Sequence, residues 1–222
     1  TTGHFGLQLH GSQEMHVEFQ AVELLKPVKT EASPEFAELG ALAPDFTLTD
    51  LSGESHTLSG LRGKTVVLEW FNPGCPVVKR AHTTGPLVSM GNDVSSDDVV
   101  WLAINSGAPG KQGHGVEVNR EAAATWSMQY PVLIDEEGVV GQRYRAKTTP
   151  HMYVINPEGR LVYNGAIDNA PSGRPGDEYK NFVEMALECV AEGREIDFGA
   201  NPYGCSVKYA GGKSGKRGRK RN

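Results

Sequence analysis

One seven-residue run, residues 65–71 (TVVLEWF), constrains the fold more than any other segment. It is apolar and rich in β-branched and aromatic residues, which is typical of a buried central strand. The turn residues 72–74 (NPG) end the run, and Cys75 and Pro76 then open a predicted helix, because proline is favoured at the first helical position. The pattern predicts a strand, a tight turn and a helix with Cys75 at its N-cap.

Strands and helices alternate along the rest of the chain. The predicted strands are residues 99–104, 131–134 and 152–155, and the predicted helices are residues 117–128 and 179–191. Two hairpins are predicted, one from residues 46–48 and 55–58 and one in which the turn 156–159 leads into residues 161–163. An edge strand is predicted around residues 16–22. This alternation predicts an α/β fold with a central mixed sheet flanked by helices.

The 222 residues are enough for one α/β domain with extensions. We predict an N-terminal extension at residues 1–40, one domain at 41–209 and a basic tail at 210–222. No stretch approaches the roughly 18 consecutive apolar residues of a membrane helix. The chain starts at Thr1 rather than Met, which favours a processed chain and, with it, a bacterial extracytoplasmic compartment over the cytoplasm.

Charge is distributed unevenly. The formal net charge is −5, but residues 213–222 hold six of the 22 Lys and Arg and no acid. The other 212 residues, with 16 basic and 27 acidic side chains, carry a net charge of −11. This acidic body argues against nucleic-acid binding by the domain. The Gly, Ser and charge content of residues 213–222 predicts a solvated tail.

Three cysteines, Cys75, Cys189 and Cys205, are too few for a disulfide-rich scaffold and lack paired metal-ligand spacing. A helix N-terminus lowers a thiol pKa, because free backbone N–H groups and the helix dipole stabilise the thiolate. Cys75 is therefore the candidate nucleophile, against the alternative of a small buried apolar residue. Cys189 is predicted on an apolar helix face, in the core. We expect no metal and no organic cofactor.

Residues 67–79 (VLEWFNPGCPVVK) resemble the active-site segment of thioredoxin-superfamily redoxins, with Cys75 at the first cysteine of their CxxC motif and Val78 at the second. The peroxiredoxin pattern PxxxTxxC is incomplete, since Pro73 lies two residues before Cys75 with no threonine between them. The similarity extends over most of residues 43–209. Its further parts are residues 101–106 (WLAINS), 148–151 (TTPH) and 203–209 (YGCSVKY). Together they resemble a peroxiredoxin-like, AhpC/TSA-related branch with a second cysteine near the C-terminus.

This resemblance implies a thioredoxin-like fold and several site residues. Pro150 matches the cis-proline beside the reactive sulfur, which leaves the backbone of Thr149 free to pair with an extended substrate. Pro76 and Trp70 are the other predicted substrate contacts. Glu69 matches a buried acid that assists proton transfer in these proteins. The alternative interpretation is that Glu69 is an ordinary charged residue that faces the edge of the strand.

The remaining polar candidates carry alternatives of their own. Cys205 is the candidate resolving cysteine, against an unpaired thiol in a loop-like segment. His82 and His151 could donate protons or contact substrate, but a lone histidine is more simply structural or exposed. Lys79 and Arg80, which follow Cys75 on the predicted helix, are expected to face water.

Three functions fit these residues. The first is a thiol–disulfide oxidoreductase with a Cys75 thiolate resolved by Cys205. The second is a thiol peroxidase in which Cys75 becomes a sulfenic acid and condenses with Cys205. The third is a non-catalytic binding module on the same fold. The first two imply a protein or small-molecule disulfide or peroxide as substrate, and a thiol electron donor.

Overall fold

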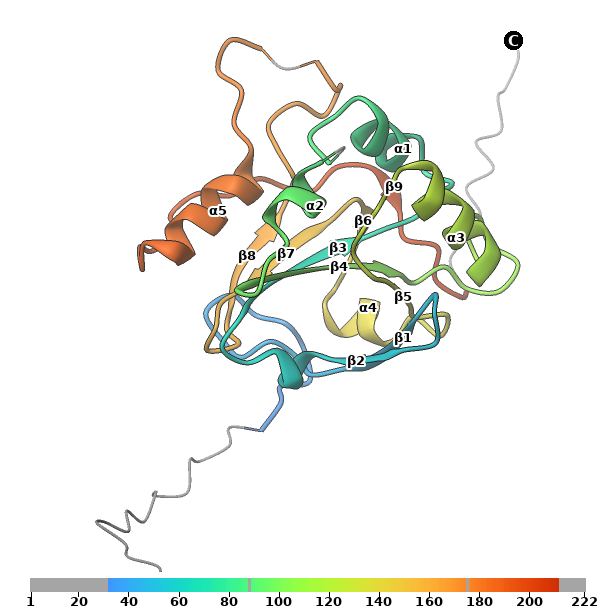
Figure 1. The fold of residues 1–222 in the computed structure, drawn as a ribbon, viewed down its shortest axis with the longest axis horizontal. Coiled ribbons are helices and arrows are strands. Elements are labelled where there is room, and N and C mark those ends of the chain that lie inside the picture. The colour runs from blue at the N-terminus through green and yellow to red at the C-terminus, as the bar shows by residue number, and fades with distance from the viewer. Residues whose placement is uncertain (1–31, 88, 175, 212–222) are drawn as a thin grey trace, which may run out of the picture. The chain divides into compact units, whose positions relative to one another are not determined.

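Seven strands form one mixed sheet in the order β2-β1-β5-β4-β3-β7-β8 (Figure 1). The structure is a computed structural model that describes residues 32–87, 89–174 and 176–211. Its strands are β1 Thr47–Asp50, β2 Ser55–Thr57, β3 Thr65–Trp70, β4 Val99–Asn105, β5 Val132–Ile134, β6 Thr148–Thr149, β7 Met152–Ile155, β8 Leu161–Gly165 and β9 Cys205–Ser206. The predicted α/β fold with a mixed sheet is confirmed. The strand predicted at 16–22 and the basic segment 213–222 lie outside the described residues.

Strand β3 lies inside the sheet, as its composition predicts. All six of its residues are buried. It pairs in parallel with β4 and antiparallel with β7, so its backbone donors and acceptors are bonded on both edges. Both predicted hairpins are present as the antiparallel pairs β1/β2 and β7/β8.

Five α-helices and one 3₁₀ turn, η1 Leu58–Leu61, complete the described elements. The helices are α1 Pro76–Thr83, α2 Met90–Val94, α3 Val116–Thr125, α4 Val139–Arg143 and α5 Phe182–Ala191. The prediction of 179–191 for the last helix began three residues early, because the Asn181 side chain caps the helix by accepting from Val183 N and Glu184 N. The helix predicted at 117–128 ends at Thr125, close to the left-handed φ of 52° at Ser127.

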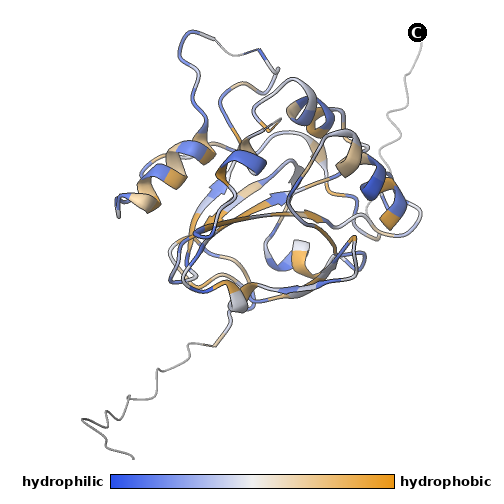
Figure 2. Ribbon diagram, viewed as in Figure 1, coloured by the Kyte–Doolittle hydropathy of each residue, from blue (hydrophilic) through white to orange (hydrophobic). Residues whose placement is uncertain are grey.

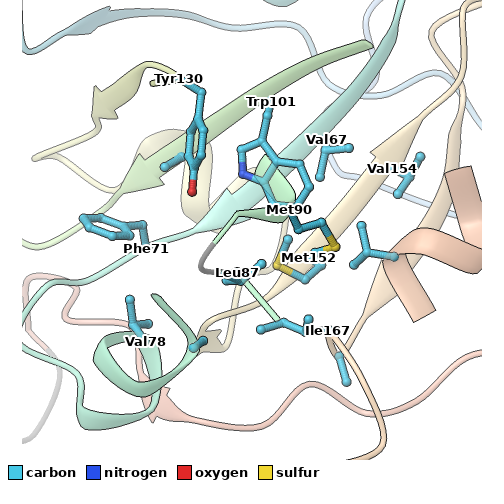
Figure 3. Packing of buried hydrophobic residues seen from close by; sticks show 14 of the residues in the cluster. Val67, Phe71, Val78, Leu87, Met90, Trp101, Tyr130, Met152, Val154 and Ile167 are labelled. Atoms are coloured by element: carbon cyan, nitrogen blue, oxygen red, sulfur yellow. The ribbon is translucent and has the colours of Figure 1, made fainter. Parts of the chain in front are cut away.

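Side chains of β3 alternate between two hydrophobic clusters, one on each face of the sheet. Val67 and Phe71 belong to the cluster under α1, α2, α3 and α5, and Figure 3 shows them packed with Trp101 and Val78. Leu68 belongs to the opposite cluster, over which α4 and η1 lie. The hydropathy colouring shows the apolar strands running through the middle (Figure 2). Cys189 lies buried against the first cluster's side, as predicted.

The segments at both ends of the described chain are attached to this domain. Near the start, Ala37 is buried and its N–H bonds the carbonyl of Arg143 at 2.9 Å. Near the end, Ala166 N–H bonds the carbonyl of Ala200 at 3.0 Å before the chain reaches β9. The predicted domain limits at residues 41 and 209 remain predictions. Among the described helices, none combines the length and apolar character that crossing a bilayer requires.

Candidate active site

The loop between β3 and α1 places Cys75 at the start of the helix. Cys75 is the N-cap, with extended dihedral angles, and Pro76 follows at the first helical position, as predicted. Asn72 holds the turn: its Oδ1 accepts from Gly74 N at 2.8 Å and its carbonyl accepts from Cys75 N at 3.0 Å. The side chain of Gln112 covers the loop by donating to the Gly74 carbonyl at 2.7 Å.

The sulfur of Cys75 is fully covered, with an exposed fraction of 0%. As a thiol it donates to the carbonyl of Thr149 at 3.1 Å. Burial by itself raises the pKa of Cys75, but hydrogen bonds from the Cys205 thiol, the Val78 N–H, the Thr149 hydroxyl and the Cys205 N–H outweigh it and hold this pKa below the usual thiol range. The position of Cys75 at the start of α1 and beside Thr149 and Cys205 therefore favours the thiolate, while in its thiol form the sulfur donates to the Thr149 carbonyl.

Strand β9 brings Cys205 to the same place. It pairs antiparallel with β6, with Cys205 opposite Thr149 and Ser206 opposite Thr148. Cys205 is half-buried, and Cys75, Cys189 and Cys205 are all free thiols. Burial first, and then the neighbouring Cys75, raise the pKa of Cys205 to about 11. The pKa values of the two cysteines are thus shifted in opposite directions.

The positive φ of Gly204 allows β9 to approach β6 closely. Gly204 has a φ of 140°, and a Cβ built on it would lie 2.1 Å from the carbonyl oxygen of Thr149. Any side chain there would push β9 away from β6. The segment that carries Cys205, residues 203–208, is fixed on both sides of this contact: the Tyr203 hydroxyl bonds Asp168, and Val207 N–H bonds the Lys147 carbonyl at 3.1 Å. We refer to residues 203–208 as the covering segment.

The peptide bond between Thr149 and Pro150 is cis, as the resemblance implied. The expectation that the backbone of Thr149 is free for a substrate is wrong for this state of the protein. The chain's own β9 occupies that edge. The sequence did not show this because the pairing joins residues 56 positions apart.

A sequence profile of the AhpC/TSA family matches residues 39–164, which is more than half of the chain. The chain belongs to the AhpC/TSA family. Two solved structures are similar over most of their length. A hypothetical protein of Sinorhizobium meliloti 1021 has 26% identity and a TM-score of 0.68, covering 79% of this chain and 96% of its own. An uncharacterized conserved protein of Geobacillus kaustophilus has 28% identity and a TM-score of 0.67, covering 78% and 92%. The fold is thioredoxin-like.

Curated relatives match this AhpC/TSA chain over about half of its length. The thiol-disulfide oxidoreductase ResA of Geobacillus kaustophilus is 31% identical over 124 residues, which are 55% of this chain and 66% of the relative. The thioredoxin-like protein YneN of Bacillus subtilis is 29% identical over 120 residues, 54% and 66% respectively. The chain thus spans just under two thirds of the length of these two relatives.

Glu69 is buried, with 0% exposed, so the alternative of an edge-facing charge is wrong. Its carboxylate accepts from His82 Nε2 at 2.7 Å, from the Trp101 indole at 3.3 Å and from the Tyr130 hydroxyl at 3.5 Å. Burial and the charge of Glu69 raise the pKa of Tyr130 and keep its phenol protonated. His82 lies seven residues after Cys75, roughly 10 Å along a helix. Within the described residues no hydrogen bond joins Glu69 to Cys75, so its predicted role in proton transfer remains a prediction.

Trp70 does not reach the site. Its side chain points to the face of the sheet opposite Cys75, is fully buried, and donates to Ser106 Oγ at 3.0 Å. It packs against Tyr144 and Tyr153, so the predicted substrate contact is wrong. Side chains alternate along a strand, so Trp70 and Glu69 had to face opposite ways. Pro76 is exposed beside Cys75, where a substrate contact remains a prediction.

His151 is structural in this protein. It is 3% exposed, and its Nδ1 is 2.9 Å from the Tyr153 hydroxyl. Burial, with a smaller effect of the Lys147 charge, lowers the pKa of His151 to about 4. The folded state therefore binds a proton less readily than the unfolded chain, so the stabilising contribution is complete above about pH 6.5 and is lost as the pH falls toward 4.

We expect acid to destabilise the wild-type domain through His151 by an amount on the order of 3 kcal/mol between pH 6.5 and 4. Urea unfolding of the wild type and of His151→Asn across this range measures the effect. The free energies of unfolding of the two proteins should converge as the pH falls. Parallel curves would contradict the prediction.

The alkylation rate of Cys75 should rise with a midpoint below the ordinary thiol pKa of about 8.5. The reason is the set of donors around its sulfur. Iodoacetamide labelling of the Cys205→Ser variant against pH, followed by peptide mapping, gives the midpoint for Cys75 alone. Since that variant retains the Val78 N–H and the Thr149 hydroxyl, a midpoint at or above 8.5 would remove the case for an activated nucleophile.

Sequence reasoning missed Asp168, and it predicted Thr149 as a substrate contact through its backbone without assigning a role to its hydroxyl. Asp168 is buried and accepts a hydrogen bond from the Tyr203 hydroxyl, which fixes the covering segment. The Tyr179 hydroxyl, outside that segment, donates to the other carboxylate oxygen of Asp168. The Thr149 hydroxyl faces the Cys75 sulfur from the loop of Pro150, where the peroxiredoxin pattern would supply a threonine from the loop of the cysteine itself. No local pattern in the sequence marked either the Asp168 carboxylate or the Thr149 hydroxyl.

Proposed function

We propose that this protein is a thiol–disulfide oxidoreductase in which Cys75 and Cys205 are the redox pair. The observation that carries the proposal is that both cysteines meet at Thr149: the Cys75 thiol donates to the Thr149 carbonyl at 3.1 Å, and the pairing of β6 with β9 sets Cys205 opposite Thr149. Curated relatives named thiol-disulfide oxidoreductase ResA support the same activity. The substrates would be protein or small-molecule disulfides, and the electrons would come from a thiol donor.

The chemistry follows from the difference in acidity. The Cys75 thiolate attacks one sulfur of a substrate disulfide, and the S–S bond breaks with release of one substrate thiolate. Cys205, once deprotonated, attacks the Cys75 sulfur and releases the second substrate thiolate. The substrate gains two electrons, and the enzyme is left with a Cys75–Cys205 disulfide. These exchange steps take place between sulfur atoms and require no metal or organic cofactor.

Access to Cys75 limits this reaction. Because its sulfur is fully covered, a substrate disulfide can reach it only when the covering segment lifts from β6. β9 is held by its two residues paired with β6, by the hydrogen bond from Tyr203 to Asp168 and by the hydrogen bond from Val207 N–H to the Lys147 carbonyl. The segment is short enough to open without disturbing the central sheet.

Thiol peroxidase activity is the second candidate, and one observation favours it. The Thr149 hydroxyl lies beside the Cys75 sulfur, where it can bond a peroxide oxygen, and a fully covered thiol discriminates in favour of a small substrate. The Cys75 thiolate would attack one oxygen of the peroxide, the O–O bond would break, and the other oxygen would leave as hydroxide or water, so that Cys75 becomes a sulfenic acid. The Cys205 thiol would then attack the Cys75 sulfur, form the Cys75–Cys205 disulfide and release the sulfenic oxygen as a second water.

Reduction of a model disulfide, consumption of hydrogen peroxide and mapping of the oxidised protein together test the proposal. We expect disulfide reduction, and a reversible Cys75–Cys205 link after mild oxidation while Cys189 remains a free thiol. Consumption of peroxide alone would favour the second candidate. A protein with neither activity would be a binding module, and a Cys75–Cys189 link would overturn the assignment of Cys205.

A further inference from the structure

The two cysteines of the redox pair differ in their exposure to solvent. The sulfur of Cys75 lies at 0% exposure beneath the covering segment, whereas Cys205 is itself part of that segment and is only half-buried. Since the Cys75 thiol donates to the Thr149 carbonyl and the register of β9 sets Cys205 opposite Thr149, an S–S bond between the two cysteines can close with β9 still on β6. In the oxidised protein the solvent-facing side of the disulfide is therefore the Cys205 side.

We propose that an external thiol reduces this disulfide by attacking the sulfur of Cys205, so that Cys205 exchanges with the electron donor and Cys75 is the internal leaving group. The inference rests on the proposed function, because it concerns the disulfide that the proposed cycle produces. It assigns to Cys205 a second role, as the residue that forms the mixed disulfide with the donor. The donor never has to reach the buried sulfur.

The reduction is an ordinary thiol–disulfide exchange. The donor thiolate forms a bond to Cys205 Sγ, the bond between the two cysteines breaks, and its electron pair stays on Cys75 Sγ as a thiolate. A second thiolate of the donor then attacks the donor sulfur of the mixed disulfide. This releases Cys205 and leaves the donor as a disulfide, so the donor loses the two electrons that the enzyme gains.

The groups around Cys75 and Cys205 favour attack on the Cys205 sulfur over attack on the Cys75 sulfur. The leaving thiolate on Cys75 is stabilised by the Val78 N–H at the start of α1 and by the Thr149 hydroxyl, and the more acidic thiol leaves faster. Lys208 adds positive charge near Cys205, which attracts an approaching thiolate. Attack on Cys75 would instead expel Cys205, whose pKa is raised. The donor class that fits is a dithiol, small or protein-borne, that presents its thiolate at the surface.

Glutathione adducts on the oxidised full-length protein test the inference. In a Cys189→Ser background, the isolated disulfide form is mixed with excess glutathione, quenched with acid at early times, alkylated and mapped by mass spectrometry. We expect adducts on Cys205 to exceed those on Cys75 by on the order of tenfold, because accessibility decides which sulfur is attacked. Equal adducts, or a majority on Cys75, would overturn the inference.

A matched pair of tyrosine variants tests the cause. Tyr203 and Tyr179 both bond Asp168, but only Tyr203 belongs to the covering segment. Tyr203→Phe should loosen the segment and raise the share of adducts on Cys75, whereas Tyr179→Phe should leave the share unchanged. An unchanged share in Tyr203→Phe would contradict the inference. If no Cys75–Cys205 disulfide can be isolated at all, the proposed function fails as well, while adducts on Cys75 of an isolated disulfide overturn the inference alone.

Discussion

Replacing Cys75 with serine is expected to reduce disulfide reductase activity at least about 1,000-fold, because a hydroxyl at this position is neither ionised nor nucleophilic near neutral pH. The structure offers no substitute with the same surroundings among the described residues: Cys205 has a raised pKa, and Cys189 is buried on α5. Initial rates of reduction of a model disulfide, with dithiothreitol as donor, measure the loss. The fold should be retained, since serine is nearly isosteric.

Cys189→Ser is the matched control for this experiment. It removes a buried thiol of the same kind, whose only described polar contact is with Arg194, and should leave the rate unchanged. Cys205→Ser should behave differently from both, because the first attack by Cys75 still occurs. A mixed disulfide between Cys75 and the substrate should then accumulate. Substantial activity in Cys75→Ser would remove Cys75 from the reaction.

Much of the fold follows from short-range patterns. The run at 65–71 predicts β3 because an apolar, β-branched strand can be satisfied only inside a sheet, and all its strand residues are indeed buried. The Cys75-Pro76 pair predicts the start of α1 for an equally local reason. Helix ends were less predictable. Asn181 caps α5 through its own side chain, and periodicity alone cannot distinguish a cap from a helical residue.

The individual residues of the site were predictable from the sequence, but the covering of Cys75 by β9 was not. Cys75, Thr149, Pro150 and Cys205 were each identified from motifs, and the structure brings all four together. That β9 pairs with β6, and so covers Cys75, depends on a contact between distant segments that no local pattern encodes. Trp70 failed for the opposite reason: its proximity in sequence to Cys75 suggested contact, while strand alternation sends its side chain to the other face.

The buried network around Glu69 should dominate the stability of the domain near the site. Glu69→Ala removes the acceptor of His82, Trp101 and Tyr130, which leaves several buried donors without a partner. The cost of such orphaned groups, and of breaking a buried hydrogen-bonded pair, predicts a loss of roughly 3–5 kcal/mol in the free energy of unfolding. Urea unfolding at pH 7 measures it.

Two variants show whether the loss comes from these hydrogen bonds. Glu69→Gln keeps a carbonyl oxygen that can accept from His82 or Trp101, so it should cost less than Glu69→Ala while slowing turnover if the carboxylate exchanges protons during the cycle. Glu117→Ala removes an exposed carboxylate paired with Arg120 on α3 and should change stability little, because exposed ion pairs contribute little. Glu69→Ala with wild-type stability would mean that His82, Trp101 and Tyr130 find other partners. The network would then not be what holds α1 to β3 and β4, and α1 would depend instead on apolar packing, in which Val78 and Phe71 take part.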